Sequence, residues 1–230
     1  MELRSLERKI GLNFKNKDLL KTAFTHRSYL NEHPDEKLPH NERLEFLGDS
    51  VLGFIISTYL YNKYPNHPEG DLTNFRSSIV NARILSKVAK DLGLGEFLFL
   101  SRGEESTGGR QRQYILANTY EALLGAIHLD QGLTESSRFV DKTLLPNLQE
   151  IIKKKLYKDY KSLLQELLQA KFNVTPSYKL ISERGPDHSK IFEIGVYMKE
   201  KLLAAGSGNS KQTSEQAAAK NALENITKLK

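Results

Sequence analysis

The chain has 230 residues, of which 39% are hydrophobic and 27% charged, with a mean hydropathy of −0.49 and a formal charge of +6. This composition excludes collagen-like and low-complexity chains, and the longest uncharged run, residues 50–62, is shorter than the roughly 20 apolar residues that span a bilayer. The N-terminus lacks the apolar stretch of a signal peptide and cysteine is absent, so we expect a cytoplasmic protein without disulfides, thiolate metal sites or membrane contact.

The first 150 residues have the pattern of packed helices. Apolar residues recur at helical spacing in residues 44–55 and again in residues 116–127. Segments rich in Pro, Gly, His and charge at residues 31–40, 64–70 and 101–109 predict loops. No convincing run of alternating apolar and polar residues occurs here, so we expect a helical domain without a sheet.

The pattern of apolar and polar residues changes in the last third of the chain. The domains expected are residues 1–152 and 159–230, joined by a linker over residues 153–158. Within the second domain the pattern predicts a helix, three strands and a helix, with a turn before the second strand and a break after the third. The predicted ranges are 161–172, 177–184, 190–199, 202–205 and 214–229, with the turn at 185–188 and the break at 206–209.

Charge also divides the chain at this point. Residues 1–150 have 19 basic and 20 acidic residues, whereas residues 151–230 have 15 basic and 8 acidic residues. A basic excess confined to the last third favours a polyanionic partner, with nucleic acid first. A solvated lysine-rich module would have the same composition, so charge alone leaves both interpretations open.

Two pairs of oxygen side chains stand out in the helical part. Glu45 and Asp49 are four residues apart, and Asn118 and Glu121 are three apart, so each pair shares one face of its helix. Facing each other, the two pairs would form an all-oxygen site suited to Mg²⁺ or Mn²⁺ rather than zinc. Acids at this spacing more often simply face solvent, as most Asp and Glu residues do.

Other catalytic chemistries find less support. The six histidines include no His-x-x-x-His pair, and the Glu-x-x-His pairs of a di-iron carboxylate oxidase are missing. Neither a Walker loop, a dinucleotide fingerprint nor a Gly-x-Ser-x-Gly elbow is present.

Four motifs resemble those of the ribonuclease III family. Residues 41–49 (NERLEFLGD) resemble its signature, and residues 116–126 (LANTYEALLGA) resemble its second acidic motif. Residues 25–29 and 69–72 resemble its supporting motifs, and the tail from about residue 159 resembles a double-stranded RNA-binding domain.

The resemblance implies a fold and an activity. The fold is an all-α endonuclease domain followed by a small α-β-β-β-α RNA-binding domain. The activity is metal-dependent hydrolysis of double-stranded RNA by a homodimer, without a small-molecule cofactor. Products carry 5′-phosphate and 3′-hydroxyl ends with short 3′ overhangs. The substrates that the family implies are ribosomal precursors, messenger leaders, antisense duplexes and other structured RNAs.

The resemblance also assigns roles to residues. The implied ligands of Mg²⁺, for which Mn²⁺ can substitute, are Glu45, Asp49, Asn118 and Glu121, of which Asp49 and Glu121 are also assigned as catalytic. The tail is expected to read the shape of a duplex through its first helix, the turn before its second strand and the N-terminus of its last helix. The matching positions are Gln165, Glu166, Pro186, His188, Asn209, Ser210, Lys211 and Gln212.

Other motif residues have two interpretations. Phe46 matches a knob that enters the partner subunit, but it is also typical of a helix core. Glu42 and Glu69 are candidates for RNA contact or ordinary surface acids. His26 and Arg27 are expected to be structural residues hydrogen-bonded in the helical core.

The chain departs from the family pattern at the metal site and in the tail. Asn118 stands where the family usually has Asp, so one negative charge is missing from the site. Asn209 and Gln212 stand where basic residues are common, which predicts weaker binding and a shallower salt dependence. The alternative function is therefore a double-stranded RNA-binding protein of this fold with weakened or lost catalysis.

Overall fold

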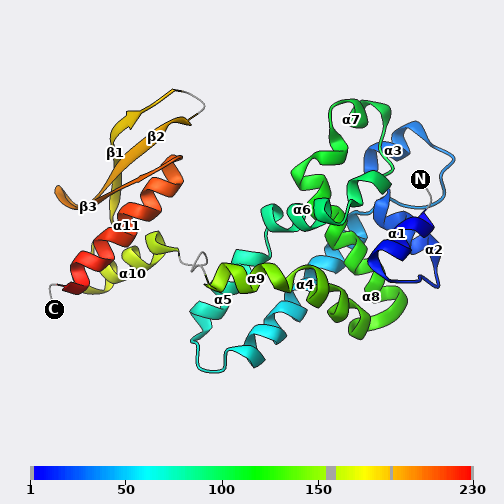
Figure 1. Ribbon diagram of the computed structural model, residues 1–230, viewed down its shortest axis with the longest axis horizontal. Coiled ribbons are helices and arrows are strands. Elements are labelled where there is room, and N and C mark those ends of the chain that lie inside the picture. Colours follow the sequence, from blue (N-terminus) through cyan, green and yellow to red (C-terminus); the bar gives the residue numbers. More distant parts are fainter. Residues whose placement is uncertain (1–2, 154–158, 187–188, 229–230) are drawn as a thin grey trace. The chain divides into compact units, whose positions relative to one another are not determined.

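The computed structural model describes residues 3–153, 159–186 and 189–228 (Figure 1). The chain divides into two compact units, Met1–Tyr157 and Lys158–Lys230, which are described separately. None of the described helices is long and apolar enough to cross a membrane.

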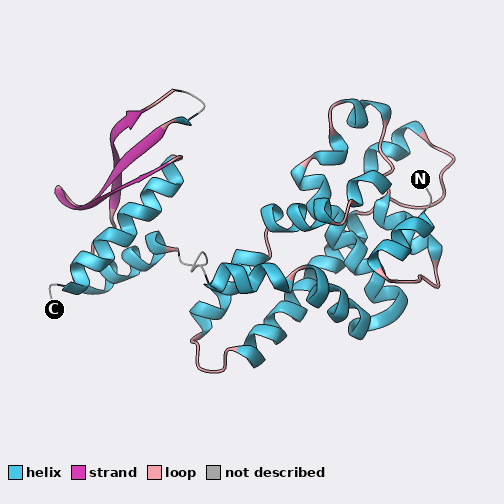
Figure 2. Ribbon diagram, viewed as in Figure 1, coloured by secondary structure: helices cyan, strands magenta, loops and turns pink. Residues whose placement is uncertain are grey.

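The first unit is built from helices, as the sequence predicts (Figure 2). Its described residues form no strand, and one isolated bridge joins Thr25 to Phe99. The loop predicted at residues 101–109 is partly wrong, because Ser101 accepts a hydrogen bond from the Glu104 amide and starts a short helix. The helices are α1 (Leu3–Ile10), α2 (Lys17–Phe24), α3 (Arg27–Glu32), α4 (Glu42–Lys63), α5 (Glu69–Ile79), α6 (Ala82–Asp91), η1 (Leu94–Phe97), α7 (Arg102–Ser106), η2 (Gly109–Gln111), α8 (Gln113–Thr143) and α9 (Leu145–Lys153).

Helices α4 and α8 form the centre of the first unit and approach closely at two glycines. A Cβ atom on Gly48 would lie 1.8 Å from the carbonyl oxygen of Glu121, and one on Gly125 would lie 2.3 Å from that of Leu44. Any side chain at either position would push the helices apart. The two glycines therefore fix the distance between the helices that carry both acidic motifs.

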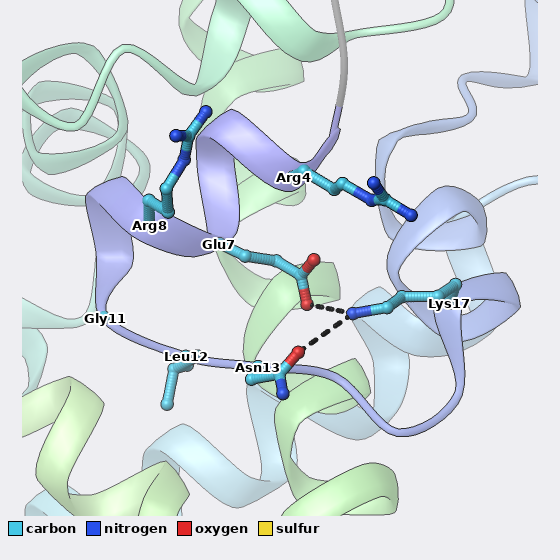
Figure 3. A pocket seen from close by; sticks show the side chains of 7 residues that line it. All are labelled: Arg4, Glu7, Arg8, Gly11, Leu12, Asn13 and Lys17. Carbon is cyan, nitrogen blue, oxygen red and sulfur yellow. Dashed lines mark hydrogen bonds and ion pairs between the residues drawn. The ribbon is translucent and has the colours of Figure 1, made fainter.

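A buried acid fixes the turn between α1 and α2 (Figure 3). Glu7 accepts hydrogen bonds from the Phe14 amide at 2.7 Å and from Lys17 Nζ at 2.6 Å. Lys17 also donates to Asn13 Oδ1 at 3.1 Å. These bonds satisfy the carboxylate of a residue only 6% exposed and hold Phe14 in the core.

The second unit is a three-stranded antiparallel sheet with two helices. The strand order is β1-β2-β3, α11 packs against β2 and β3, and α10 packs against α11. A small core of buried Leu, Val and Ala side chains lies between the helices and the sheet. The elements are α10 (Tyr160–Phe172), β1 (Ser177–Arg184), β2 (Ile191–Met198), β3 (Lys201–Gly208) and α11 (Lys211–Lys228).

Two predictions for this unit are wrong in detail. The break predicted at residues 206–209 is strand up to Gly208, because the small residues there let β3 lie against the backbone of α11. Helix α11 starts at Lys211 rather than Ser214, since Ser210 Oγ accepts a hydrogen bond from the Thr213 amide at 3.2 Å.

Parts of two further predictions lie outside the described residues. Of the predicted linker, Lys153 belongs to α9 and residues 154–158 are not described. Of the predicted turn, Gly185 and Pro186 are described and lie outside the strands, whereas residues 187 and 188 are not described.

Candidate active site

The structure brings the two predicted pairs of oxygen side chains together across the α4–α8 contact. Glu45 and Asp49 lie on α4, and Asn118 and Glu121 lie on α8. The Asn118 side chain lies close enough to Glu45 to lower the pKa of its carboxyl group, and the charges of Glu45 and Asp49 both act on Glu121. We call these four residues the acid cluster.

The N-terminus of α4 is anchored where the cluster begins. Asn41 is buried and donates from its side chain to the Ala23 carbonyl at 3.3 Å and from its amide to the Thr25 carbonyl at 2.9 Å. These bonds tie the first turn of α4 to the end of α2. The face of α4 that carries Glu45 is therefore fixed relative to the rest of the unit.

The cluster holds its carboxylates in an unfavourable electrostatic environment. Burial, and then the charges of Asp49 and Glu45, raise the pKa of Glu121 to about 7. Burial also raises the pKa of Glu45, with the charges of Glu42 and Asp49 adding to the shift and the Asn118 amide opposing it. Both acids thus resist ionisation unless a cation compensates their charge.

The donor set fits a hard divalent cation. It consists of three carboxylates and one amide, all of which offer oxygen. In the described part of the chain, no three His, Cys, Asp or Glu side chains lie close enough together to hold one metal ion in the conformation observed. The cluster is therefore a set of neighbouring oxygen ligands rather than a preformed coordination shell.

Basic residues border the cluster at Glu42. Arg27 Nη1 lies 3.7 Å and His40 Nδ1 lies 3.9 Å from the Glu42 carboxylate. The prediction that Arg27 is a core residue is wrong, because its side chain is 72% exposed. His26 is structural as predicted, since its Nδ1 accepts the Ser28 amide hydrogen and caps α3.

The structure places Glu69 and Phe46 on the surface. Glu69 is exposed at the start of α5, where its carboxylate accepts from Thr73 Oγ1 at 2.8 Å, and none of the described contacts joins it to the acid cluster. Phe46 is 78% exposed, so the interpretation of Phe46 as helix core is wrong. Its ring borders a hollow of about 780 Å³ that Leu19, Leu47 and Leu129 also line.

The predicted RNA-binding residues of the second unit are mostly exposed. Gln165 and Glu166 lie on the open face of α10, and Pro186 lies just after β1. His188 lies outside the described residues. Asn209, Lys211 and Gln212 are exposed at the N-terminus of α11, whereas the Ser210 hydroxyl is occupied as its cap.

The sequence reasoning missed a network that supports the start of α8. Arg112 is paired with Glu104 and donates to the Thr107 carbonyl and hydroxyl oxygens at 3.0 Å each. These bonds join α7 to the start of α8, six residues before Asn118. The dense charge in residues 102–112, a segment that overlaps the loop predicted at residues 101–109, is the signal that could have indicated this network.

Comparisons with known proteins identify the family of each unit. Residues 16–148 match the family model described as ribonuclease-III-like, and residues 160–226 match the double-stranded RNA binding motif. Ribonuclease 3 of Streptococcus equi subsp. zooepidemicus is 47% identical over 224 residues, which cover 97% of each chain. Ribonuclease 3 of Streptococcus gordonii is 48% identical over 216 residues, covering 94% of this chain and 93% of that relative.

Solved structures resemble the first unit. The nuclease domain of ribonuclease III from Campylobacter jejuni is 38% identical, with a TM-score of 0.58, and covers 64% of this chain and 95% of that one. A second structure of that domain has a TM-score of 0.57 and covers 62% of this chain and 98% of that one. It is described as showing structural flexibility in a region involved in dimer formation.

Proposed function

The chain belongs to the ribonuclease III family and is an endoribonuclease of double-stranded RNA, and we propose that it cleaves its substrate with Mg²⁺ bound at the acid cluster. Enzymes of this family depend on a metal ion, and Mn²⁺ is the expected substitute. The proposed products carry 5′-phosphate and 3′-hydroxyl ends with short 3′ overhangs.

The partial burial of Glu121 beside Glu45 and Asp49 is the observation that carries the metal proposal. A partly buried carboxylate whose pKa is raised to about 7 by burial and by two neighbouring acids is costly to ionise. A divalent cation would offset both the burial and the repulsion. The same four side chains offer only oxygen, which is the ligand that Mg²⁺ prefers.

Each residue of the cluster has a distinct part in this proposal. Glu45 and Asp49 would hold the cation from α4, and Glu121 and Asn118 would hold it from α8. When bound, the metal ion lowers the pKa of a water molecule and stabilises charge on the leaving oxygen. The carboxylates of Asp49 and Glu121 would orient the attacking water relative to the scissile phosphate, and Asn118 supplies an oxygen without adding charge.

The second unit would hold the duplex by its shape. Double-stranded RNA exposes its 2′-hydroxyls in a shallow minor groove, and domains of this kind span about 16 base pairs. We expect Gln165, Glu166, Pro186 and His188 to contact the minor grooves. Asn209, Lys211 and Gln212 lie at the N-terminus of α11, where the helix dipole favours phosphate.

A homodimer is proposed with Phe46 at its interface. An aromatic side chain that is 78% exposed and borders a hollow lined by leucines is unfavourable in water. Analytical ultracentrifugation should give twice the chain mass for the wild-type protein, and Phe46→Ala should raise the dissociation constant at least tenfold. A dimer of unchanged affinity in Phe46→Ala would place the interface elsewhere.

We further propose that the enzyme acts in the cytoplasm on ribosomal and messenger RNA precursors. The absence of cysteine and the RNA-binding motif support this location and substrate class. Glu42 and Glu69 remain candidates for contact with the strand, and for Glu42 such a contact would include its neighbour Arg27.

Cleavage of a labelled RNA duplex during a Mg²⁺ titration tests the proposal. We expect cleavage by the wild-type chain, at least a hundredfold loss in Glu121→Gln, and a lower Mg²⁺ requirement in Asn118→Asp. Absence of cleavage by both the wild-type chain and Asn118→Asp would support the alternative, a binding protein of this fold. Cleavage by the wild-type chain in EDTA would contradict the metal proposal.

A further inference from the structure

Tyr114 lies on the same face of α8 as the two cluster residues of that helix. It precedes Asn118 by four residues and Glu121 by seven, spacings that recur on one side of an α-helix. At 1.5 Å rise per residue, its Cα lies about 6 Å along the helix axis from that of Asn118. Tyr114 is therefore one helical turn beyond the cluster.

The side chain of Tyr114 is not part of the hydrophobic core. It is 51% exposed, in contrast to the buried Ile115, Leu116 and Ala117 that follow it. Its ring and hydroxyl group are therefore accessible from outside the unit, one helical turn from the cluster.

The position of the Tyr114 ring is fixed by Arg112. The Arg112 guanidinium lies 5.9 Å from the ring centre, and its Nη1 donates to the Tyr114 hydroxyl oxygen at 3.4 Å. Arg112 is itself held by Glu104 and Thr107. Because the hydroxyl oxygen accepts from Arg112, its own hydrogen is available for an acceptor in solution.

The chemistry of the surroundings indicates which acceptor this is. A phosphate held at the acid cluster has a neighbouring nucleotide on either side, and a carboxylate beside that nucleotide would repel its backbone. The Tyr114 hydroxyl group is an uncharged hydrogen-bond donor one helical turn from the cluster. The bases of a duplex are stacked and paired, so the ring can reach only the sugar and the phosphate.

We propose that Tyr114 binds the sugar-phosphate backbone of the nucleotide next to the cleaved bond, donating a hydrogen bond from its hydroxyl group. The inference rests on the proposed function, because it assumes that the scissile phosphate lies at the acid cluster. It adds a subsite for the strand that is separate from the ligands of the metal and from the RNA-binding unit.

Tyr114→Phe tests the contact because it removes only the hydroxyl group. A single neutral hydrogen bond corresponds to about a two- to tenfold effect, so we expect KM for a duplex to rise by that factor while kcat changes less. Tyr61→Phe is the matched control, since Tyr61 is 73% exposed on α4 near its far end. An unchanged KM in Tyr114→Phe would overturn the proposal.

Two further measurements separate this contact from other roles. The first is the Kd for the duplex in a Glu121→Gln background, a measurement that requires no cleavage. Tyr114→Phe should raise this Kd by the same factor. Equal Kd values with and without Tyr114→Phe would refute the contact, even if the metal proposal also fails. Ultracentrifugation should give the same dimer affinity for Tyr114→Phe and the wild-type chain. A weaker dimer with an unchanged duplex Kd would assign Tyr114 to the subunit interface instead.

Substrate variants identify the acceptor. Replacing the 2′-hydroxyls on either side of the cleaved bond by hydrogen should abolish the difference between Tyr114→Phe and the wild-type chain if Tyr114 binds the sugar. If the difference persists with this substrate, the acceptor is a phosphate oxygen. Both results support the backbone contact, and they differ only in the atom bound.

Discussion

Glu121 should make the stability of the metal-free chain depend on pH, and its replacement by Gln should remove that dependence. The pKa of Glu121 is raised from 4.5 to about 7 by burial and by the charges of Asp49 and Glu45. Between these pH values the folded chain keeps a proton that the unfolded chain has lost. The free energy of unfolding therefore falls as pH rises from 4.5 to 7 and changes little above that range.

The size of the effect follows from the shift. One pH unit corresponds to about 1.4 kcal/mol, so a shift of this size is equivalent to about 3 kcal/mol if solvent screening is ignored. Glu121 is only partly buried, and solvent screening reduces the expected value to about 2 kcal/mol. Without metal, Glu121→Gln should be more stable than the wild-type chain by about this amount at pH 8 and nearly equal to it at pH 4.5.

Urea unfolding followed by circular dichroism, in EDTA at several pH values, measures the difference. Glu96→Gln is the control, because Glu96 is an exposed acid of the same unit outside the cluster. At pH 8, Mg²⁺ should stabilise the wild-type chain more than Glu121→Gln, since the cation binds the folded site. The reasoning is refuted if Glu121→Gln retains the pH dependence of the wild-type chain.

Three other substitutions test the packing and the RNA surface. Gly48→Ala should lower the melting temperature and abolish cleavage, because its Cβ would lie 1.8 Å from the Glu121 carbonyl oxygen, whereas Gly53→Ala on the same helix meets nothing within 4 Å and should be tolerated. Lys211→Ala should weaken duplex binding for all sequences and lower the slope of log K against log salt by about one, as titration with KCl would show. Ser214→Ala should destabilise the second unit by about 1 to 2 kcal/mol in thermal unfolding, because its buried hydroxyl donates to the Phe192 carbonyl at 2.8 Å.

Much of the fold could be predicted from sequence because its periodicities are local. The spacing of apolar residues is sufficient to identify α4 and α8, and the alternation in residues 190–199 is sufficient to identify β2. The extent of β3 was missed because its final glycines look like a break until the close approach of α11 is known. Side-chain caps at Ser101 and Ser210 likewise decide where α7 and α11 begin.

The sequence is sufficient to predict which candidate residues lie next to each other on a helix, but not which of them are buried. Helical spacing places Glu45 beside Asp49, and Asn118 beside Glu121, without knowledge of the fold. Which acid is buried depends on how α4 crosses α8, and the contacts of Gly48 and Gly125 set that crossing. Spacing also does not distinguish an exposed Phe46 from a buried one, since this depends on what packs over its helix.

Asn118 instead of an aspartate is expected to have two opposite effects. It reduces the repulsion between the acids of the metal-free cluster, and it weakens the attraction for a cation. In the free chain its amide lowers the pKa of Glu45, whereas an aspartate there would add a fourth carboxylate and further repulsion. With the proposed cation bound, the same amide would provide an oxygen ligand but no charge, so the attraction for a divalent cation would be weaker than with an aspartate. We therefore expect Asn118 to favour the folded metal-free chain at the expense of affinity for the proposed cation, so that cleavage by the wild-type chain should require more Mg²⁺ than cleavage by Asn118→Asp.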